Sequence, residues 1–351
     1  MPATSGPRRV VVFGLGGTIA MARSEAGGVG LALSAADLVG AVPGLAEVGV
    51  DLEAVDFCRM PGASLDFPDL AALGEEIDRA VNSRAGGIVV IQGTDTLEET
   101  AYLIDLHYTG EQPVVFTGAM RNPTMAGADG PANLLAAVRT AASDLAKGLG
   151  VLVVLADEVH AARRVRKTHT SSGATFQSPN GGPVGYLSEG RFCLLNRLTD
   201  RLAVPRAGSA SPRVALVTIS LGDHGELLDG LAPGVDGLVV AAMGVGHVPE
   251  RLVGRLEDLA SRMPVVLASR TGAGAVARST YGFSGSETDL IKRALIPAGF
   301  LDPLKARLLL RAALAAGADT QRIADTFALA GGYQTTATWP WPDPPTDNGV
   351  H

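Results

Sequence analysis

Hydroxyl and carboxylate side chains stand where an apolar run gives way to a helix-like pattern, in the segment VVIQGTDTLEETAYLID at 89–105. One helix cap would explain one of them. Thr96 suits that role because Glu99 follows three residues later, as in a capping box. Thr94 or Asp95 could be the cap instead. One cap still leaves the other polar residues unexplained at a strand end, where buried polar groups need partners. We therefore predict that Thr94 and Asp95 belong to a chemical site.

A second candidate hydroxyl is Thr18, in the segment GLGGTI after the first apolar run. Gly16 and Gly17 permit a tight turn that would expose this hydroxyl. A dinucleotide-binding loop is disfavoured, because the third glycine of G-x-G-x-x-G would fall at Ile19, and a GxxxxGK segment is absent from the sequence. The alternative is that Thr18 caps a turn.

An unactivated threonine hydroxyl is a poor nucleophile, so a threonine site needs a nearby base or a relay for its proton. Lys167, in the hydroxyl-rich segment 163–178, could supply such a relay together with Asp95. From spacing alone, a solvated surface lysine is the alternative interpretation of Lys167.

Composition narrows the class of protein and of partner. The 351 residues are 46% apolar and 19% charged, which is typical of a globular protein. The formal charge of −7 and the lack of a long basic cluster disfavour a nucleic-acid or anionic-membrane partner. A small neutral or zwitterionic substrate fits this balance better.

Cys58 and Cys193 lack the spacing of metal ligands or of a redox pair, so we predict two small core residues and no metal site. No segment reaches the roughly 18 apolar residues that would span a bilayer. We therefore expect a cytoplasmic protein.

The elements that must position these residues follow an α/β pattern. Apolar runs without alternation predict strands covered on both faces, at 8–15, 86–93, 113–119, 150–157, 214–222, 237–246 and 264–270. Apolar residues at three- and four-residue spacing predict helices at 64–83, 131–147 and 302–317. Alternating strands and helices indicate a parallel sheet flanked by helices, with a second, smaller α/β domain.

A stretch rich in Pro, Ser and Gly at 201–214 predicts the linker between these domains. We expect an N-terminal catalytic domain, the linker, a C-terminal domain and a Pro-rich tail at 1–204, 205–213, 214–330 and 331–351. Trp339 and Trp341, the only tryptophans, could dock this otherwise flexible tail on a surface.

Several segments together resemble one known family, the bacterial-type L-asparaginases. The resemblance covers about residues 8 to 330, in the family's order and approximate spacing. It is carried by GGTIA (16–20), GTDTLEETAYLIDL (93–106), PVVFTGAMR (113–121), ADGPANL (128–134), GVLVV (150–154) and KTHTSSGATFQS (167–178). It implies hydrolysis of L-asparagine to L-aspartate and ammonia, without a metal or an organic cofactor, with minor L-glutamine or D-asparagine activity possible.

Carried over residue by residue, the resemblance implies that Thr18 is the primary nucleophile and Thr94 the second catalytic threonine. Lys167 would polarise Thr94, and Asp95 would hold both Lys167 and the α-ammonium group of the substrate. Backbone around Thr94 and Ala119 would contact the amide, where N–H donors stabilise a developing oxyanion.

The substrate carboxylate needs hydrogen-bond donors, and the family supplies one from a serine between its second and third strands. Ser64 aligns best with that serine, although Ala63 lacks the usual donor before it. Asp66 has an alternative role as a helix cap.

Two departures from the family concern groups around the nucleophile. The loop at 21–36 lacks the tyrosine that often assists the first threonine. In the family, an acidic residue from a neighbouring subunit enters the site. We hypothesise that Glu287 is this acid and that Tyr281 replaces the phenol. A surface glutamate in a loop is the alternative for Glu287.

Val245 and His247 stand where the family commonly has asparagines. His247 could approach the substrate or tune Glu287, although a lone histidine is more often a packing or solvent-facing residue. These departures leave a second interpretation open, a non-catalytic amino-acid sensor on the same fold. The family also implies a homodimer or a homotetramer.

Overall fold

The computed structural model describes residues 7–17, 19, 21–23, 29–31, 33–198, 201–206, 208, 210–231, 234–334 and 338–342. The chain divides into two compact units, residues 1–201 and 202–351. The exact domain and linker boundaries expected above stay a prediction.

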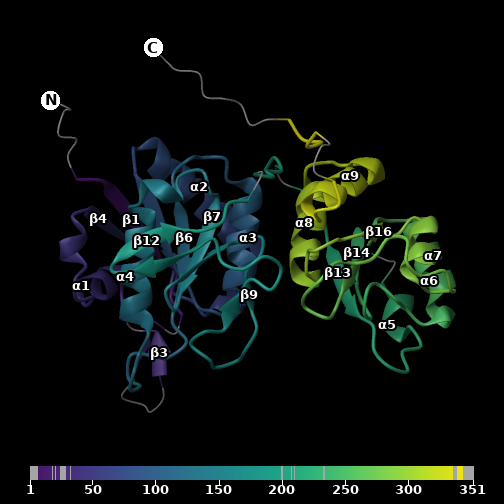
Figure 1. The fold of residues 1–351 in the computed structure, drawn as a ribbon, viewed down its shortest axis with the longest axis horizontal. Coiled ribbons are helices and arrows are strands. Elements are labelled where there is room, and N and C mark those ends of the chain that lie inside the picture. The colour runs from purple at the N-terminus through teal and green to yellow at the C-terminus, as the bar shows by residue number, and fades with distance from the viewer. Residues whose placement is uncertain are drawn as a thin grey trace. The chain divides into compact units, whose positions relative to one another are not determined.

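The first unit is built on a mixed sheet, which has eight strands in the described part of the chain (Figure 1). Their order is β12-β11-β8-β7-β6-β5-β1-β4. The strands are β1 (Arg9–Gly14), β4 (Asp51–Asp56), β5 (Gly87–Ile91), β6 (Val114–Thr117), β7 (Val151–Leu155), β8 (Glu158–Ala161), β11 (Gly185–Ser188) and β12 (Arg191–Leu194). The five strands from β7 to β4 are parallel, which confirms the expected parallel centre.

Helices cover both faces of this sheet: α1 (Ala35–Gly40), α2 (Phe67–Asn82), α3 (Leu97–His107) and α4 (Gly130–Ala141). Val10 and Val12 of β1 point into a core shared with α1 and α4. Val11 and Phe13 point into a second core shared with α2 and α3. Successive side chains of a strand point to opposite faces, so a continuous apolar run requires two apolar surroundings. The predicted α/β class is confirmed.

Three antiparallel strands, β8, β11 and β12, extend the sheet beyond the expected elements. Cys193 lies on the edge strand β12 and is exposed, so its predicted place in the core is wrong, while Cys58 is half-buried. Two short hairpins pair β2 (Met21–Arg23) with β3 (Val29–Leu31), and β9 (Arg166–Lys167) with β10 (Phe176–Gln177). Short single-turn helices stand at Ala46–Val48, Gly62–Ser64 and Asp144–Ala146.

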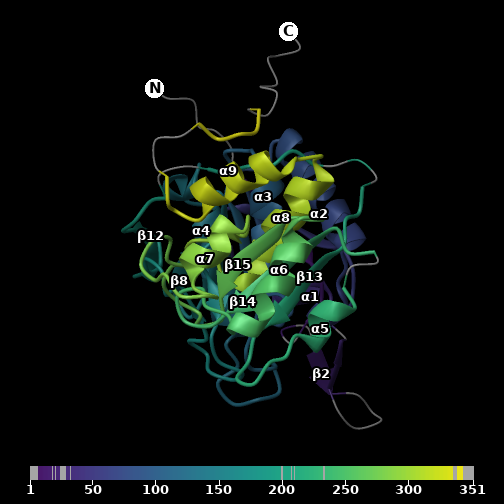
Figure 2. The ribbon, with the colours of Figure 1, turned by 90° about the vertical axis from the view of Figure 1, so that its right-hand side faces the viewer.

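The second unit has its own parallel sheet, β13 (Val214–Thr218), β14 (Gly237–Ala242), β15 (Val265–Ser269) and β16 (Ile296–Pro297). Its helices are α5 (Glu226–Asp229), α6 (Val253–Ala260), α7 (Glu287–Lys292), α8 (Pro303–Ala315) and α9 (Thr320–Ala330), with a single turn at Glu250–Leu252 (Figure 2). One face of the sheet packs against α5, α6 and α7. Helix α8 contacts β13, β14 and β15, and Val239 and Val266, outside that cluster, are fully buried.

The predicted ends of the helix at 302–317 are confirmed. Asp302 is the N-cap and accepts N–H bonds from Leu304 and Lys305, with Pro303 at the first helical position. Gly317 follows the end of α8 with φ of +77°. In the described ranges of the chain, no helix is long and apolar enough to cross a membrane.

Candidate active site

The described candidate residues of the first unit gather at the carboxyl ends of the parallel strands, where loops of an open sheet commonly form a binding site. The segments after β1, β4 and β5 meet through three glycines. A Cβ placed on Gly17 would lie 2.2 Å from the Gly93 nitrogen, and one placed on Gly62 would lie 2.9 Å from the Gly93 carbonyl oxygen. The three backbones therefore touch, and this approach leaves no room for a side chain at Gly17 or Gly62.

Thr18 itself lies outside the described residues, between Gly17 and Ile19. Gly17, which has φ of +94°, precedes Thr18 in the sequence just as Gly93 precedes Thr94. The contact between Gly17 and Gly93 thus brings together the backbones directly before the two predicted catalytic threonines.

Gly17→Ala is expected to lower the free energy of unfolding by more than about 3 kcal/mol, because it adds a steric overlap with Gly93 to the strain of a positive φ. Gly49→Ala is the matched control, since Gly49 has φ of +73° and nothing within 4 Å of an added Cβ. Its loss should be the strain alone, about 1 to 2 kcal/mol. Urea unfolding measures both, and equal losses would contradict the close approach.

Lys167 binds both groups that were expected beside it at a threonine site, the Thr94 hydroxyl and the Asp95 carboxylate. Its Nζ donates to Thr94 Oγ1 at 2.9 Å and to Asp95 Oδ1 at 3.2 Å. Thr94 is buried, with 5% of its surface exposed, whereas the Asp95 side chain is 67% exposed. The Lys167 side chain is only 18% exposed, so the alternative of a solvated surface lysine is wrong. Among the described residues, no hydrogen bond engages the second carboxylate oxygen of Asp95, so this oxygen could face another cation.

The β9–β10 hairpin holds Lys167 in this place. Lys167 pairs with Phe176 across the hairpin, and Phe176 and Val165 are buried in the core below α2 and α3. The Thr168 hydroxyl and backbone N–H both bond the Thr175 carbonyl oxygen. A hairpin anchored by two apolar side chains gives the long lysine side chain a fixed origin.

Thr96 differs from its expected role. It occupies the N-cap position of α3, but its side chain makes no cap hydrogen bond. Its hydroxyl donates instead to the Gly62 carbonyl oxygen at 2.8 Å and accepts from the buried Gln92 at 3.1 Å. Thr96 therefore fastens the loop after β4 to the loop after β5, a tertiary contact that a capping-box pattern does not reveal.

The loop after β6 is fixed by two residues whose roles were not anticipated. Asp129 accepts the backbone N–H groups of Met120 and Arg121 at 3.0 and 2.9 Å. Asn133 donates to the Gly118 carbonyl oxygen at 3.0 Å and accepts from the Ala156 N–H. These bonds hold the backbone around Ala119, which is buried. The only signal in the sequence was the motif ADGPANL, which contains both residues.

Ser64 and Asp66 separate into two roles. Asp66 is the N-cap of α2 and forms a capping box with Asp69, so the alternative of a helix cap is confirmed for it. Ser64 is exposed and ends the single turn that starts at Gly62. This turn places Ser64 two residues from the glycine contact with Gly93.

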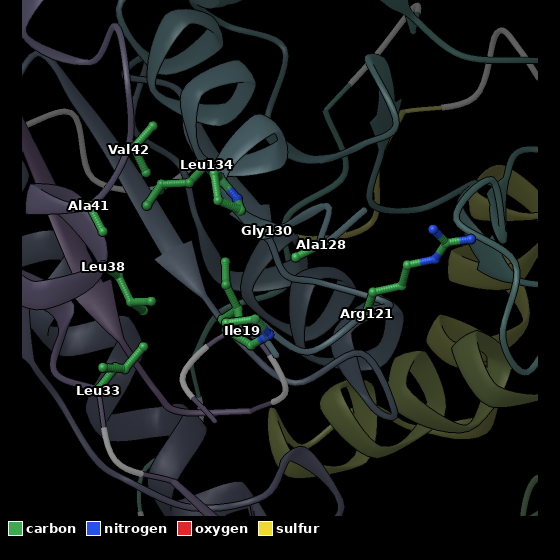
Figure 3. A pocket seen from close by; sticks show the side chains of 11 residues that line it. Ile19, Leu33, Leu38, Ala41, Val42, Arg121, Ala128, Gly130 and Leu134 are labelled. Carbon is green, nitrogen blue, oxygen red and sulfur yellow. The ribbon is translucent and has the colours of Figure 1, made fainter. Parts of the chain in front are cut away.

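An apolar pocket of about 140 Å³ lies between α1 and α4, beside Ile19 (Figure 3). Leu38 and Val42 line one side, and Leu134 lines the other. In Figure 3 the guanidinium of Arg121 points away from these side chains. A zwitterionic amide would lose its hydrogen bonds to water there, so this pocket does not suit such a substrate.

In the second unit, Glu287 is fully buried as the first residue of α7, so the alternative of a surface glutamate is wrong. Its Oε1 accepts the N–H groups of Thr280 and Tyr281 at 2.8 Å each, and its Oε2 lies 3.3 Å from His247 Nε2. Burial alone would raise the pKa of Glu287, but the N–H donors of Tyr281 and Thr280, with His247, outweigh it and lower the pKa. The carboxylate is thus held ionised inside its own unit.

Aromatic side chains cover this carboxylate. The His247 ring lies edge-on to Tyr281 and Phe283, with centroid distances of 4.9 and 5.0 Å. Tyr281 and Phe283 are 45% and 50% exposed, and the His247 side chain is 25% exposed. The surface above Glu287 is therefore presented by His247, Tyr281 and Phe283. Val245, the other departure from the family, accepts the Ala277 N–H with its carbonyl oxygen at 2.9 Å.

Models of two protein domains match the chain. Residues 9–199 match the N-terminal asparaginase domain, and residues 213–327 match the glutaminase/asparaginase C-terminal domain. A probable L-asparaginase of Deinococcus radiodurans is 35% identical, over 93% of this chain and 98% of the relative. A probable periplasmic L-asparaginase of Haemophilus influenzae is 36% identical, over 72% of this chain and 73% of the relative.

A solved structure gives the same result for the fold. The crystal structure of a probable cytoplasmic L-asparaginase from Campylobacter jejuni has a TM-score of 0.82 and 31% identity, and covers 91% of this chain and 99% of its own. Identity of this size along most of both chains indicates common descent rather than a shared architecture alone.

Proposed function

The chain belongs to the asparaginase family and is an L-asparaginase, and from this premise we propose that it hydrolyses L-asparagine with the hydroxyl of Thr18 as nucleophile. The observation that carries this proposal is the hydrogen bond of Lys167 to Thr94, with Asp95 as the counter-charge. These groups stand next to the glycine contact that joins the segments of the two threonines.

In the proposed reaction, Thr18 Oγ1 forms a bond to the side-chain amide carbon, and its proton passes to the amide nitrogen. The carbon–nitrogen bond then breaks, and ammonia leaves an ester on Thr18. Water adds to the ester carbon, the bond to Thr18 breaks, and a proton returns to the threonine oxygen. Each half needs a proton relay, since neither a hydroxyl nor water is a strong nucleophile at neutral pH.

Thr94 and Lys167 are proposed as this relay. Nζ donates to Thr94 Oγ1 and so stabilises the negative charge that develops on this oxygen as it hands on a proton. Backbone N–H groups near Thr94 and Ala119 are proposed to receive the oxyanion, because Asp129 and Asn133 hold that loop rigidly.

The two charges of the amino-acid substrate find complementary groups at the same edge of the sheet. The exposed Asp95 carboxylate is proposed to bind the α-ammonium group, and the exposed Ser64 hydroxyl to donate to the α-carboxylate. Glutamine differs by one methylene, which changes binding by only about 1 to 3 kcal/mol, so minor glutaminase activity is included.

The test is release of ammonia by the purified protein, together with aspartate from asparagine or glutamate from glutamine, measured for both enantiomers of each amide. We expect turnover to be highest with L-asparagine. A thermal shift on adding L-asparagine without ammonia release would instead support a non-catalytic sensor, and would overturn the proposed reaction.

We also propose a homodimer or homotetramer in which Glu287 of a second copy contributes to the substrate site. Because Glu287 is buried under His247, its influence would reach the substrate through His247, and Tyr281 is proposed to supply the missing phenol. Light scattering that gives a monomer at working concentration, with full activity, would contradict this part.

A cytoplasmic location is a proposal as well. The Campylobacter neighbour is described as a probable cytoplasmic L-asparaginase and the Haemophilus relative as a probable periplasmic one, so the relatives do not agree on a compartment. Fractionation of the source cells, with asparaginase activity as the marker, would decide between them.

A further inference from the structure

The segment Trp339-Pro340-Trp341 lies beyond residue 327, where the match to the C-terminal domain model ends. Trp341 is 5% exposed, and its Nε1 donates to Thr326 Oγ1 of α9 at 3.0 Å. The guanidinium of Arg322, one turn earlier on α9, lies 5.4 Å from the centroid of the Trp341 ring. Trp341 is thus docked on α9, which confirms the expectation that a tryptophan could dock the tail on a surface.

Trp339 extends the same docked segment to the start of the second unit. Its Nε1 donates to the Ala203 carbonyl oxygen at 2.6 Å. The next residue, Val204, is buried, with 1% of its surface exposed. The hydrogen bond from Trp339 thus anchors the chain to the second unit at Ala203.

The end of the first unit is held just as closely. The Arg201 guanidinium donates to the carbonyl oxygens of Gly110 and Tyr108 at 2.6 and 2.7 Å. It also lies 5.5 Å from the centroid of the Tyr108 ring. Arg201 is the last residue of the first unit, so only Leu202 stands between an anchor on one unit and an anchor on the other.

We propose that residues 338–342 form a strap that binds α9 and Ala203 and so confines the free connection between the two units to Leu202. Releasing the strap would free the Ala203 carbonyl oxygen and loosen the described residues that follow it, as far as Arg206. The strap is thus a conformational device, because its docking sets how many residues form the free connection between the two units. It does not depend on the proposed reaction.

Limited trypsin digestion tests the strap, because Arg206 lies in the segment that it would release. We expect a chain that ends at Gln334 to be cut there about tenfold faster than the full chain, since cleavage follows the open population. The matched control ends at Pro342, which removes the residues after the strap and keeps the strap. It should be cut at the full chain's rate, with the cut sites identified by mass spectrometry.

Trp339→Phe gives a second, milder variant that keeps an aromatic ring and removes only the hydrogen bond to Ala203. A bond worth about 1 kcal/mol corresponds to roughly fivefold faster cutting at these sites. The fluorescence of the remaining Trp341 reports whether the strap stays on α9. Equal cutting rates for the full chain, the chain ending at Gln334 and Trp339→Phe would overturn the proposal.

Discussion

Thr18→Ala is expected to reduce the turnover of L-asparagine by at least about four orders of magnitude, because the reaction loses the atom that bonds the amide carbon. Melting temperature and the thermal shift with asparagine should change little, since the substitution removes one hydroxyl and one methyl group. Thr124→Ala, at an exposed threonine whose hydroxyl bonds only Asn122 among the described residues, is the control and should keep full activity. Activity of Thr18→Ala near the wild-type value would remove Thr18 from the reaction.

The same inactive variant tests whether the site is shared between copies. Glu287→Gln chains are expected to be weakly active alone, because the substitution removes the charge beneath His247. Random pairing with Thr18→Ala chains should restore about a quarter of wild-type turnover, since half of the pairs then hold one complete site. Activity equal to the sum of the separate chains would instead place Glu287 outside the site of a second copy.

The strand ends were the part of this site that the sequence could indicate. The run GIVVI indicates where β5 ends, because its side chains need apolar surroundings on both faces and the polar Gln92 and Thr94 follow it. The placement of Thr94 and Asp95 after a parallel strand follows from this alone. Lys167 could be proposed from chemistry, but its distance from Thr94 depends on a hairpin 73 residues later.

Contacts between loops were not predictable, because no local pattern encodes them. The sequence around Thr96 is typical of a helix cap, yet the Thr96 hydroxyl donates to the carbonyl oxygen of Gly62, 34 residues away. The motif ADGPANL likewise does not say that Asp129 binds backbone N–H groups of the loop after β6. In both cases, polar side chains compete between local and tertiary partners, and packing of the sheet decides the result.

Burial of Glu287 shows the same limit in the second unit. A glutamate among Ser, Gly and Thr reads as a surface residue, but two consecutive backbone N–H groups and His247 replace its water. Such a group is stable inside a protein only when its hydrogen bonds are supplied in full. The consequence is functional as well as structural, since any external ligand meets His247 and the two aromatic rings before it meets the carboxylate.

Lys167→Met is expected to lower kcat by about three orders of magnitude with a smaller effect on KM, because the relay loses its charged donor while the aliphatic stem is kept. Lys167→Arg should not restore turnover, since a planar guanidinium cannot take the place of a compact ammonium between Thr94 and Asp95. The control is Lys147→Met, which removes a lysine from an ion pair with Asp144 at the surface. Its activity should be that of the wild type.

A double-mutant cycle with Thr94→Val decides whether Lys167 acts through Thr94. If the two residues form one relay, the double variant should be about as slow as the slower single variant, because the second substitution removes nothing that still works. Independent roles would multiply the two losses to about six orders of magnitude. The cycle is measured as single-turnover rates with L-asparagine, and multiplied losses would show that the 2.9 Å hydrogen bond between Nζ and Thr94 Oγ1 is not the catalytic link.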